Sequence, residues 1–230
     1  MRRSSPILLA GIGAALLNNY WALEGLLARR SDPSSSWISD LAARTEAFGW
    51  RFELLEIASG LAVMAFAALL LSRLDGRSPL VSLGIWALIA EGVLTVVGGA
   101  APLSCAETLD PSCSLHYDAV DVVHAAADLA STAATVLAFG WIALGLDRTP
   151  GRRSAARATV AIGAVWLALT VVTGVSYLNG DVDSVKGLFQ RASQVAFGVW
   201  LVLLGWWAST AGDDARQPLG DRGGDRGGIP

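Results

Sequence analysis

The chain has 230 residues, of which 53% are hydrophobic and only 16% are charged, and its mean hydropathy is +0.49. This composition is too apolar for a water-soluble domain and predicts a protein that is solvated mainly by lipid. The formal net charge of −3 and the pI near 5.3 provide no basic surface, so we expect no nucleic-acid partner.

The apolar residues are concentrated in long runs, and the charged residues lie mostly between these runs. A helix of about 20 residues crosses the roughly 30 Å hydrocarbon core of a bilayer. Lipid offers the backbone no hydrogen-bond partners, and the runs lack the alternation of a barrel strand, so each is expected to be a helix. The runs fall at residues 7–28, 54–72, 80–101, 119–146, 159–178 and 188–209. The predicted fold class is therefore all-α, a polytopic membrane protein with a six-transmembrane-helix bundle over residues 1–210.

The first run follows Arg2 and Arg3, as the apolar core of a signal peptide does. It continues through Trp21 to Leu27, which is too long for such a core. We therefore interpret it as a retained transmembrane helix.

Two segments outside the predicted helices have a distinct composition. In the loop after the first helix, Trp37, Asp40 and Leu41 indicate a short amphipathic helix that anchors to the membrane surface. Residues 211–230 are rich in Gly, Asp and Arg, which predicts a disordered cytoplasmic tail.

The orientation is predicted from the Arg residues and the two cysteines. With the N-terminus in the cytoplasm, the cytoplasmic segments hold more Arg residues than the external ones, although the first external loop opposes this bias. Cys105 and Cys113 flank a short loop that is then external, where an oxidising environment favours a disulfide. The alternatives are two free thiols or half of a metal site. We predict a multi-pass protein of the cell membrane with both termini in the cytoplasm.

The fourth predicted helix contains a stripe of ionisable residues. Asp118, Asp121, His124 and Asp128 are spaced by three, three and four positions, which places them on one helical face. Each such group costs about 2.5 to 3.5 kcal/mol at the centre of a membrane helix, so the stripe is expected to face the bundle interior. Glu91 in the third helix lies at about the depth of Asp128, where two ionised carboxylates would repel each other.

Acids and one Arg also lie near the external ends of other helices. Glu24, Glu53, Glu56 and Arg191 are placed so that they can meet in one network in the outer leaflet. The functional interpretation is a polar cavity in which Arg191 neutralises one or two acids. The structural interpretation is that the acids are solvated at the membrane interface and that Arg191 is an ion-pair partner.

Three functions are compatible with these residues. The leading one is an outward-facing site for a small ligand, a proton or a lipid head group. The second is a membrane-embedded hydrolase or transferase in which Asp121 or Asp128 orients His124 as general base. The third is an assembly partner of another membrane protein, with small residues such as Gly98 and Gly99 at the interface.

We expect no metal and no cofactor, and the ligand and the oligomeric state stay open. His124 has no second membrane histidine to complete a zinc site. Haem would need a second axial ligand, and His116 lies in a loop. The one partner that the sequence predicts is the lipid bilayer.

Several short motifs occur in order along the chain: WISDLA after the first helix, PLSCAETLDPSC after the third, His124 in the fourth and GLFQRASQ at the start of the sixth. Together they resemble the bacterial membrane proteins of the domain of unknown function 998 family, particularly the actinobacterial members. The resemblance implies a six-helix membrane domain and no established activity. It marks Asp40, His124, Gln190 and Arg191 as positions to test.

Overall fold

The computed structural model describes residues 6–27, 32–74, 78–108, 110, 112–113, 118–178 and 185–214. Within these ranges every regular element is a helix. The elements are α1 (Pro6–Asn18), η1 (Tyr20–Leu23), α2 (Glu24–Leu27), η2 (Ser39–Ala42), α3 (Gly49–Leu74), α4 (Pro79–Gly99), α5 (Ala119–Asp147), α6 (Arg153–Leu178) and α7 (Lys186–Asp214). The all-α prediction is confirmed.

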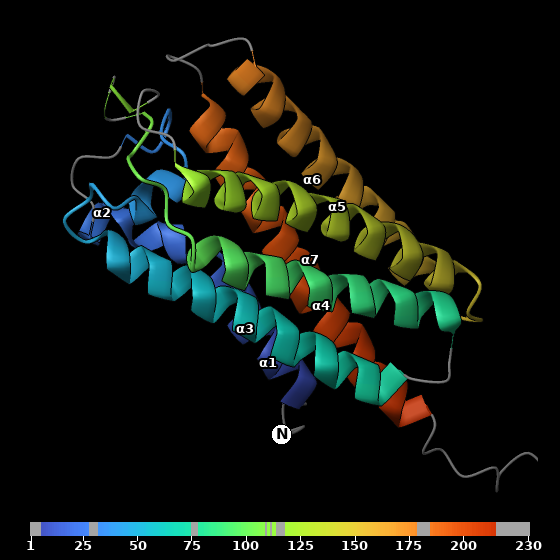
Figure 1. The fold of residues 1–230 in the computed structure, drawn as a ribbon. Coiled ribbons are helices and arrows are strands. Elements are labelled where there is room, and N and C mark those ends of the chain that lie inside the picture. The colour runs from blue at the N-terminus through green and yellow to red at the C-terminus, as the bar shows by residue number, and fades with distance from the viewer. Residues whose placement is uncertain are drawn as a thin grey trace, which may run out of the picture.

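The long helices form a closed ring in chain order. From α3 to α7 each packs against the next, and α1 closes the ring by packing against both α7 and α3. The chain runs up and down, so η2 and the α4–α5 connection lie at one end of the bundle, away from the N-terminus (Figure 1). Packing between neighbours in sequence is what short connections between antiparallel helices favour.

The interior of the ring is filled by large side chains. Phe139 of α5 stacks on Trp200 of α7 with ring centroids 3.9 Å apart, and Phe66 of α3 is fully buried. Between α3 and α4 the backbones approach closely at Gly60 and Gly92, where no side chain separates them. In lipid the hydrophobic effect does not drive helices together, and small residues at such crossings allow the close van der Waals packing that holds them in contact.

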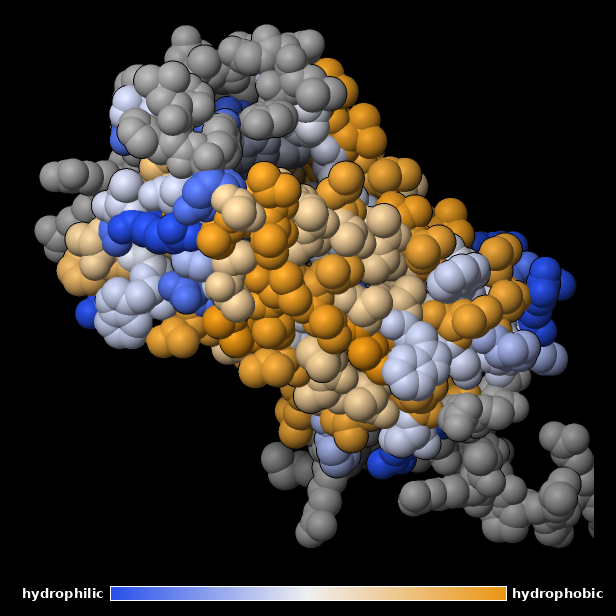
Figure 2. Space-filling model, in the orientation of Figure 1, coloured by the Kyte–Doolittle hydropathy of each residue, from blue (hydrophilic) through white to orange (hydrophobic). Residues whose placement is uncertain are grey.

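The outer surface has the composition of a membrane belt. Apolar side chains cover the middle of the face formed by α4 and α5, and hydrophilic residues gather toward the two ends of the bundle (Figure 2). Five described helices are long and apolar enough to cross a bilayer, or six if α1 and the segment Tyr20–Leu27 form one span. The chain is therefore a multi-pass membrane protein.

The first transmembrane segment is not the single helix that residues 7–28 predict. It bends by 55° between Pro6–Asn18 and Tyr20–Leu27. Two asparagine side chains bind backbone at the break: Asn19 Nδ2 donates to Ala15 O at 2.9 Å, and Asn18 Nδ2 donates to Gln194 O at 3.1 Å. Asn side chains compete with the backbone for hydrogen bonds and so favour helix ends over helix interiors.

Other bounds also differ from the prediction. From residue 32 to residue 48, the described part of the first loop, the regular structure is the 3-10 turn η2. Asp40, Leu41 and Ala42 within η2 are buried, so this turn is not a helix exposed on the membrane surface. Helix α7 continues to Asp214, four residues into the segment predicted to be a disordered tail. Residues 215–230 and His116 lie outside the described residues.

Candidate ligand cavity beneath the cap

Two loops fold together over one end of the bundle. We call residues 32–48 and the described residues of 100–113 the cap. A disulfide joins Cys105 to Cys113, with the Cα atoms 5.6 Å apart, as the loop sequence predicts. Arg44 N donates to Leu103 O at 2.9 Å, which ties the two loops through the backbone.

Asp40 is the buried centre of the cap. Its side chain is fully buried and accepts from Trp37 N at 3.1 Å, from Glu107 N at 3.0 Å and from the Thr108 hydroxyl. Burial raises the pKa of Asp40, and these hydrogen bonds offset part of that rise. The carboxylate thus joins the first loop to the second.

The cap is also bound to the start of α7. Ile38 N donates to Gln190 Oε1 at 2.8 Å, and Gly187 N donates to Ser34 O at 2.9 Å. A Cβ on Gly187 would lie 2.5 Å from Pro33 O, so this contact requires glycine.

Arg191 and Glu24 form a buried ion pair on the same side. Arg191 Nε and Nη2 donate to the two oxygens of Glu24 at 2.9 and 2.5 Å. Nη1 donates to Ser36 O and to Gly187 O, and Nη2 also reaches Ser36 Oγ at 3.3 Å. The guanidinium is thereby fully engaged, so the structural interpretation describes Arg191 and Glu24 better than the functional one.

The first two residues of the predicted stripe, Asp118 and Asp121, are bound to the cap. Asp118 caps α5, and its side chain and that of Asp121 bind each other's backbone in a capping box. Asp121 also accepts from Ser104 N at 2.7 Å and from Ser104 Oγ at 2.8 Å. Arg44 pairs with Asp118 at 3.1 Å. Asp121 therefore fixes a loop to a helix end and does not orient His124.

An open cavity of about 170 Å³ lies beneath the cap. Helices α5 and α6 diverge toward this end of the bundle (Figure 1), and the cavity occupies the space between them and α7. It is lined by Tyr20, Ile38, Ser39, Glu56, Asp128, Ser131, Thr132, Trp166, Thr170, Thr173, Gln190, Ser193 and Gln194. Most of these side chains are polar, which is unusual for a space enclosed by membrane helices.

Two carboxyl groups of the lining, those of Glu56 and Asp128, lie beside the buried imidazole of His124. His124 Nδ1 lies 3.1 Å from Gly98 O and 3.0 Å from Ala101 O; carbonyl oxygens only accept, so Nδ1 carries a hydrogen. Nε2 then faces Asp128 Oδ2 at 3.4 Å. Glu56 lies close enough to His124, Asp128 and Tyr20 to interact with them electrostatically.

Gly98 makes room for the two acids. A Cβ at this position would lie 3.4 Å from Glu56 Oε1 and 3.5 Å from Asp128 Oδ1. Glu56 Oε2 and His124 Nε2 are both buried and make no hydrogen bond within the described part of the chain. Across the described ranges, no three His, Cys, Asp or Glu side chains are grouped closely enough to hold a metal ion.

A family model, described as protein of unknown function DUF998, matches residues 9–207 of the chain. The chain belongs to the DUF998 family. No curated protein and no solved structure matches it.

Three of the four motifs that carry the DUF998 resemblance meet where the cap contacts the start of α7. Ile38 and Asp40 of WISDLA contact Gln190 of GLFQRASQ and Thr108 of the cysteine loop, respectively. These three motifs therefore lie where the cavity is covered, although they are far apart along the chain.

Like Asp121, His124 and Arg191, two further predicted site residues of this DUF998 chain lie outside the cavity lining. Glu91 is buried on α4; its side chain accepts from Thr95 Oγ1 at 3.1 Å, and its other oxygen has no partner among the described residues. Asp128 pairs with His124 and not with Glu91. Glu53 is half-buried one turn before Glu56 and does not line the cavity.

The sequence did not lead us to the residues of α6 that line the cavity. Trp166, Thr170 and Thr173 are spaced by four and three positions, so they share one face of an otherwise apolar helix. That polar stripe was a usable signal. Because α6 has no ionisable residue in its membrane interior, a search for charges passed over it.

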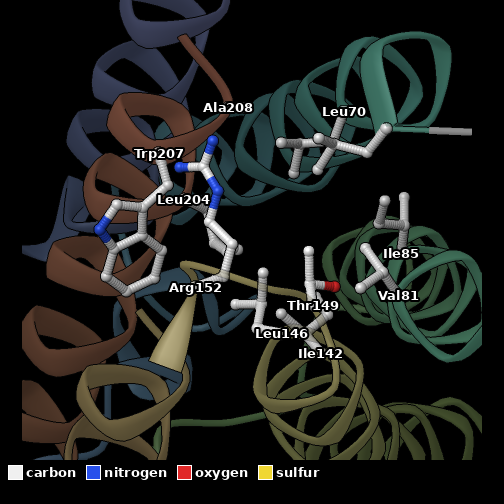
Figure 3. Close-up of a pocket in the computed structure, with 11 residues that line it drawn as sticks. Leu70, Val81, Ile85, Ile142, Leu146, Thr149, Arg152, Leu204, Trp207 and Ala208 are labelled. Carbon is white, nitrogen blue, oxygen red and sulfur yellow. The ribbon is translucent and has the colours of Figure 1, made fainter. Parts of the chain in front are cut away.

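A second pocket lies at the opposite end of the bundle and has a different character. It measures about 40 Å³ and is lined mainly by apolar side chains of α3, α4, α5 and α7. Figure 3 shows Val81 and Ile85 facing Leu204 and Trp207 across it, with Arg152 beside Trp207. It is much smaller than the cavity beneath the cap.

Proposed function

We propose that this membrane protein binds a small polar ligand, without covalent chemistry, in the cavity beneath the cap. The observation that carries the proposal is a buried carboxyl oxygen of the lining, Glu56 Oε2, which makes no hydrogen bond within the described chain. A buried polar group left unpaired costs about 1 to 3 kcal/mol. A bound molecule or ordered water in the cavity removes this cost.

The contacts favour binding over hydrolysis or group transfer. The hydroxyl of Ser131 donates to Asp128 O at 3.0 Å, and that of Ser193 donates to Gln190 O at 2.7 Å, so neither is hydrogen-bonded to a base. A nucleophile needs such a base within hydrogen-bond reach. His124 is bound to backbone carbonyls through Nδ1 and does not itself line the cavity. A packed interior would have favoured the assembly role instead.

We place the cap on the extracytoplasmic side and both termini in the cytoplasm. The Cys105–Cys113 disulfide lies in the cap, and disulfides persist in oxidising compartments. The ligand then reaches the cavity from outside the cell.

Cysteine accessibility tests the proposal in intact cells. The Ser193→Cys variant, with the native disulfide kept, is expected to react with a membrane-impermeant cationic methanethiosulfonate added outside. Gly140→Cys is the control, because Gly140 is exposed on α5 with no side chain near it and faces the apolar surface. Equal, slow reaction of both variants would show that water does not enter the cavity, and the proposal would fail.

A further inference from the structure

We propose that the ligand of this cavity carries an ammonium group, either as a small free amine or as the head group of a lipid. This inference rests on the proposed function and specifies the ligand class of the same site. It is drawn from the charge, the hydrogen-bonding capacity, the size and the aromatic faces of the lining.

The described lining contains two acidic side chains and no basic one. Glu56 and Asp128 both line the cavity, and no Arg or Lys is among the described lining residues. Of the basic groups nearby, Arg191 is paired bidentately with Glu24, and His124 Nε2 faces Asp128 Oδ2 at 3.4 Å. Glu56 is nine-tenths buried, and one of its oxygens makes no hydrogen bond in the described chain, so the lining itself supplies an unpaired carboxyl oxygen. A cation completes such a site, whereas an anion would be repelled.

Four hydroxyls of the lining offer a ligand acceptors and no donor. The hydroxyls of Ser131, Thr170, Thr173 and Ser193 all donate their single hydrogen to a carbonyl of their own helix. Each oxygen keeps a lone pair for a ligand. An ammonium group has donors and no acceptor, so it matches this arrangement, whereas a phosphate or carboxylate does not.

The size of the cavity and its aromatic lining residues further restrict the class of ligand. A cavity of about 150 Å³ holds a molecule the size of benzene, so one of about 170 Å³ suits a head group of about the same size. Trp166 and Tyr20 line it. Aromatic faces attract ammonium and quaternary ammonium ions through their negative quadrupole.

The route of access leaves two sources for the ammonium group. Helices α5 and α6, which both contribute to the lining, diverge toward the end of the bundle that carries the cap (Figure 1). A free amine enters from the aqueous side. An amine-bearing lipid places its head group between the two helices.

The first experiment uses tert-butylammonium and its neutral isostere tert-butanol on the full-length protein in a sugar-based, amine-free detergent at constant ionic strength. We expect tert-butylammonium to bind by calorimetry and tert-butanol not to bind. Asp128→Asn should weaken binding tenfold or more; the Asp128 side chain is 54% exposed, so the change leaves the fold intact. Glu53→Gln is the matched control, an acid on α3 outside the lining, and should bind as the wild type does.

The second experiment distinguishes the lipid source. In nanodiscs, phosphatidylethanolamine is expected to protect Ser193→Cys from the methanethiosulfonate reagent, compared with phosphatidylglycerol alone, and Asp128→Asn should abolish the protection. Binding in either experiment with Asp128 dependence supports the ammonium class and identifies its source.

Two results would overturn the ammonium inference. Preferential binding of tert-butanol or of the anion trimethylacetate would exclude an ammonium ligand while leaving the polar cavity a binding site. Absence of Asp128-dependent binding or protection in both experiments would also exclude it. The proposed function fails separately, if Ser193→Cys is inaccessible.

Discussion

Arg191 of α7 donates two parallel hydrogen bonds to Glu24, 167 positions earlier in the chain, at 2.9 and 2.5 Å. The side chains of both residues are more than nine-tenths buried. The pair joins the broken end of the first transmembrane segment to α7, and Arg191 also binds Ser36 O in the cap. It therefore holds the cap in place and keeps the cation away from the cavity.

Removing one charge of this pair is expected to be costly. Glu24→Gln leaves Arg191 buried without its counter-charge, which costs about 3 to 5 kcal/mol of unfolding free energy. Arg44→Ala is the control, because the Arg44–Asp118 pair is about half exposed and is worth at most about 1 kcal/mol. Thermal unfolding followed by tryptophan fluorescence in detergent measures both. Equal losses in the two variants would contradict the structural role of the buried pair.

The α3–α4 crossing gives a packing test. A Cβ on Gly60 would lie 2.5 Å from Gly92 O, a backbone atom that cannot rotate away. Gly60→Ala should therefore separate the helices and lower the unfolding free energy by about 1 to 3 kcal/mol. Gly13→Ala meets nothing within 4 Å and should be neutral or stabilising by up to about 1 kcal/mol. Equal melting temperatures for the two variants would contradict the close approach of the α3 and α4 backbones at Gly60.

Reduction of the disulfide should loosen the cap. The Cys105–Cys113 bond closes a loop with a sequence separation of 8, and a loop of this size is worth about 2 to 3 kcal/mol in the chain-entropy model. The Cys105→Ser/Cys113→Ser variant should melt lower than the oxidised wild type and match the wild type treated with a reductant. No change on reduction would mean that other contacts alone hold the cap.

The raised pKa of Asp40 predicts in which direction the stability of the protein changes with pH. Burial raises its pKa in the folded protein, so the folded state holds the proton more tightly than the unfolded chain does. Its stabilising contribution is complete below the ordinary value of 3.8 and is lost as the pH rises through the raised value. The stability of the wild type relative to Asp40→Asn should therefore decrease as the pH rises above 3.8. A difference that is flat, or that grows in favour of the wild type, would contradict the raised pKa.

The fold could be predicted because lipid imposes it. Runs long enough to cross a bilayer have to be helical, so the number and the places of the helices followed from hydropathy. The break after Asn18 could not be predicted in this way, because Asn18 there donates a hydrogen bond to Gln194 of α7, a helix that is far along the chain but adjacent in space. Hydropathy reports whether a segment crosses the membrane and carries no information on such tertiary contacts.

The site could be predicted in part. The structure divides the predicted stripe on α5: Asp121 binds Ser104 in the cap, whereas Asp128 lines the cavity. This division depends on where the α4–α5 loop folds back, which spacing alone does not determine. Thr170 and Thr173 were missed because uncharged hydroxyls are common in membrane helices and usually bind their own backbone, as these two do.

The central claim is that the space between Glu56, Asp128 and Trp166 is an open polar cavity that holds a ligand or water. A high-resolution experimental map of the protein in a nanodisc measures this directly. We expect density for a small molecule or for ordered waters within hydrogen-bond distance of Glu56 Oε2. A map in which α6 packs against α5 with Trp166 filling the space, and with Glu56 bonded only to protein, would contradict the claim.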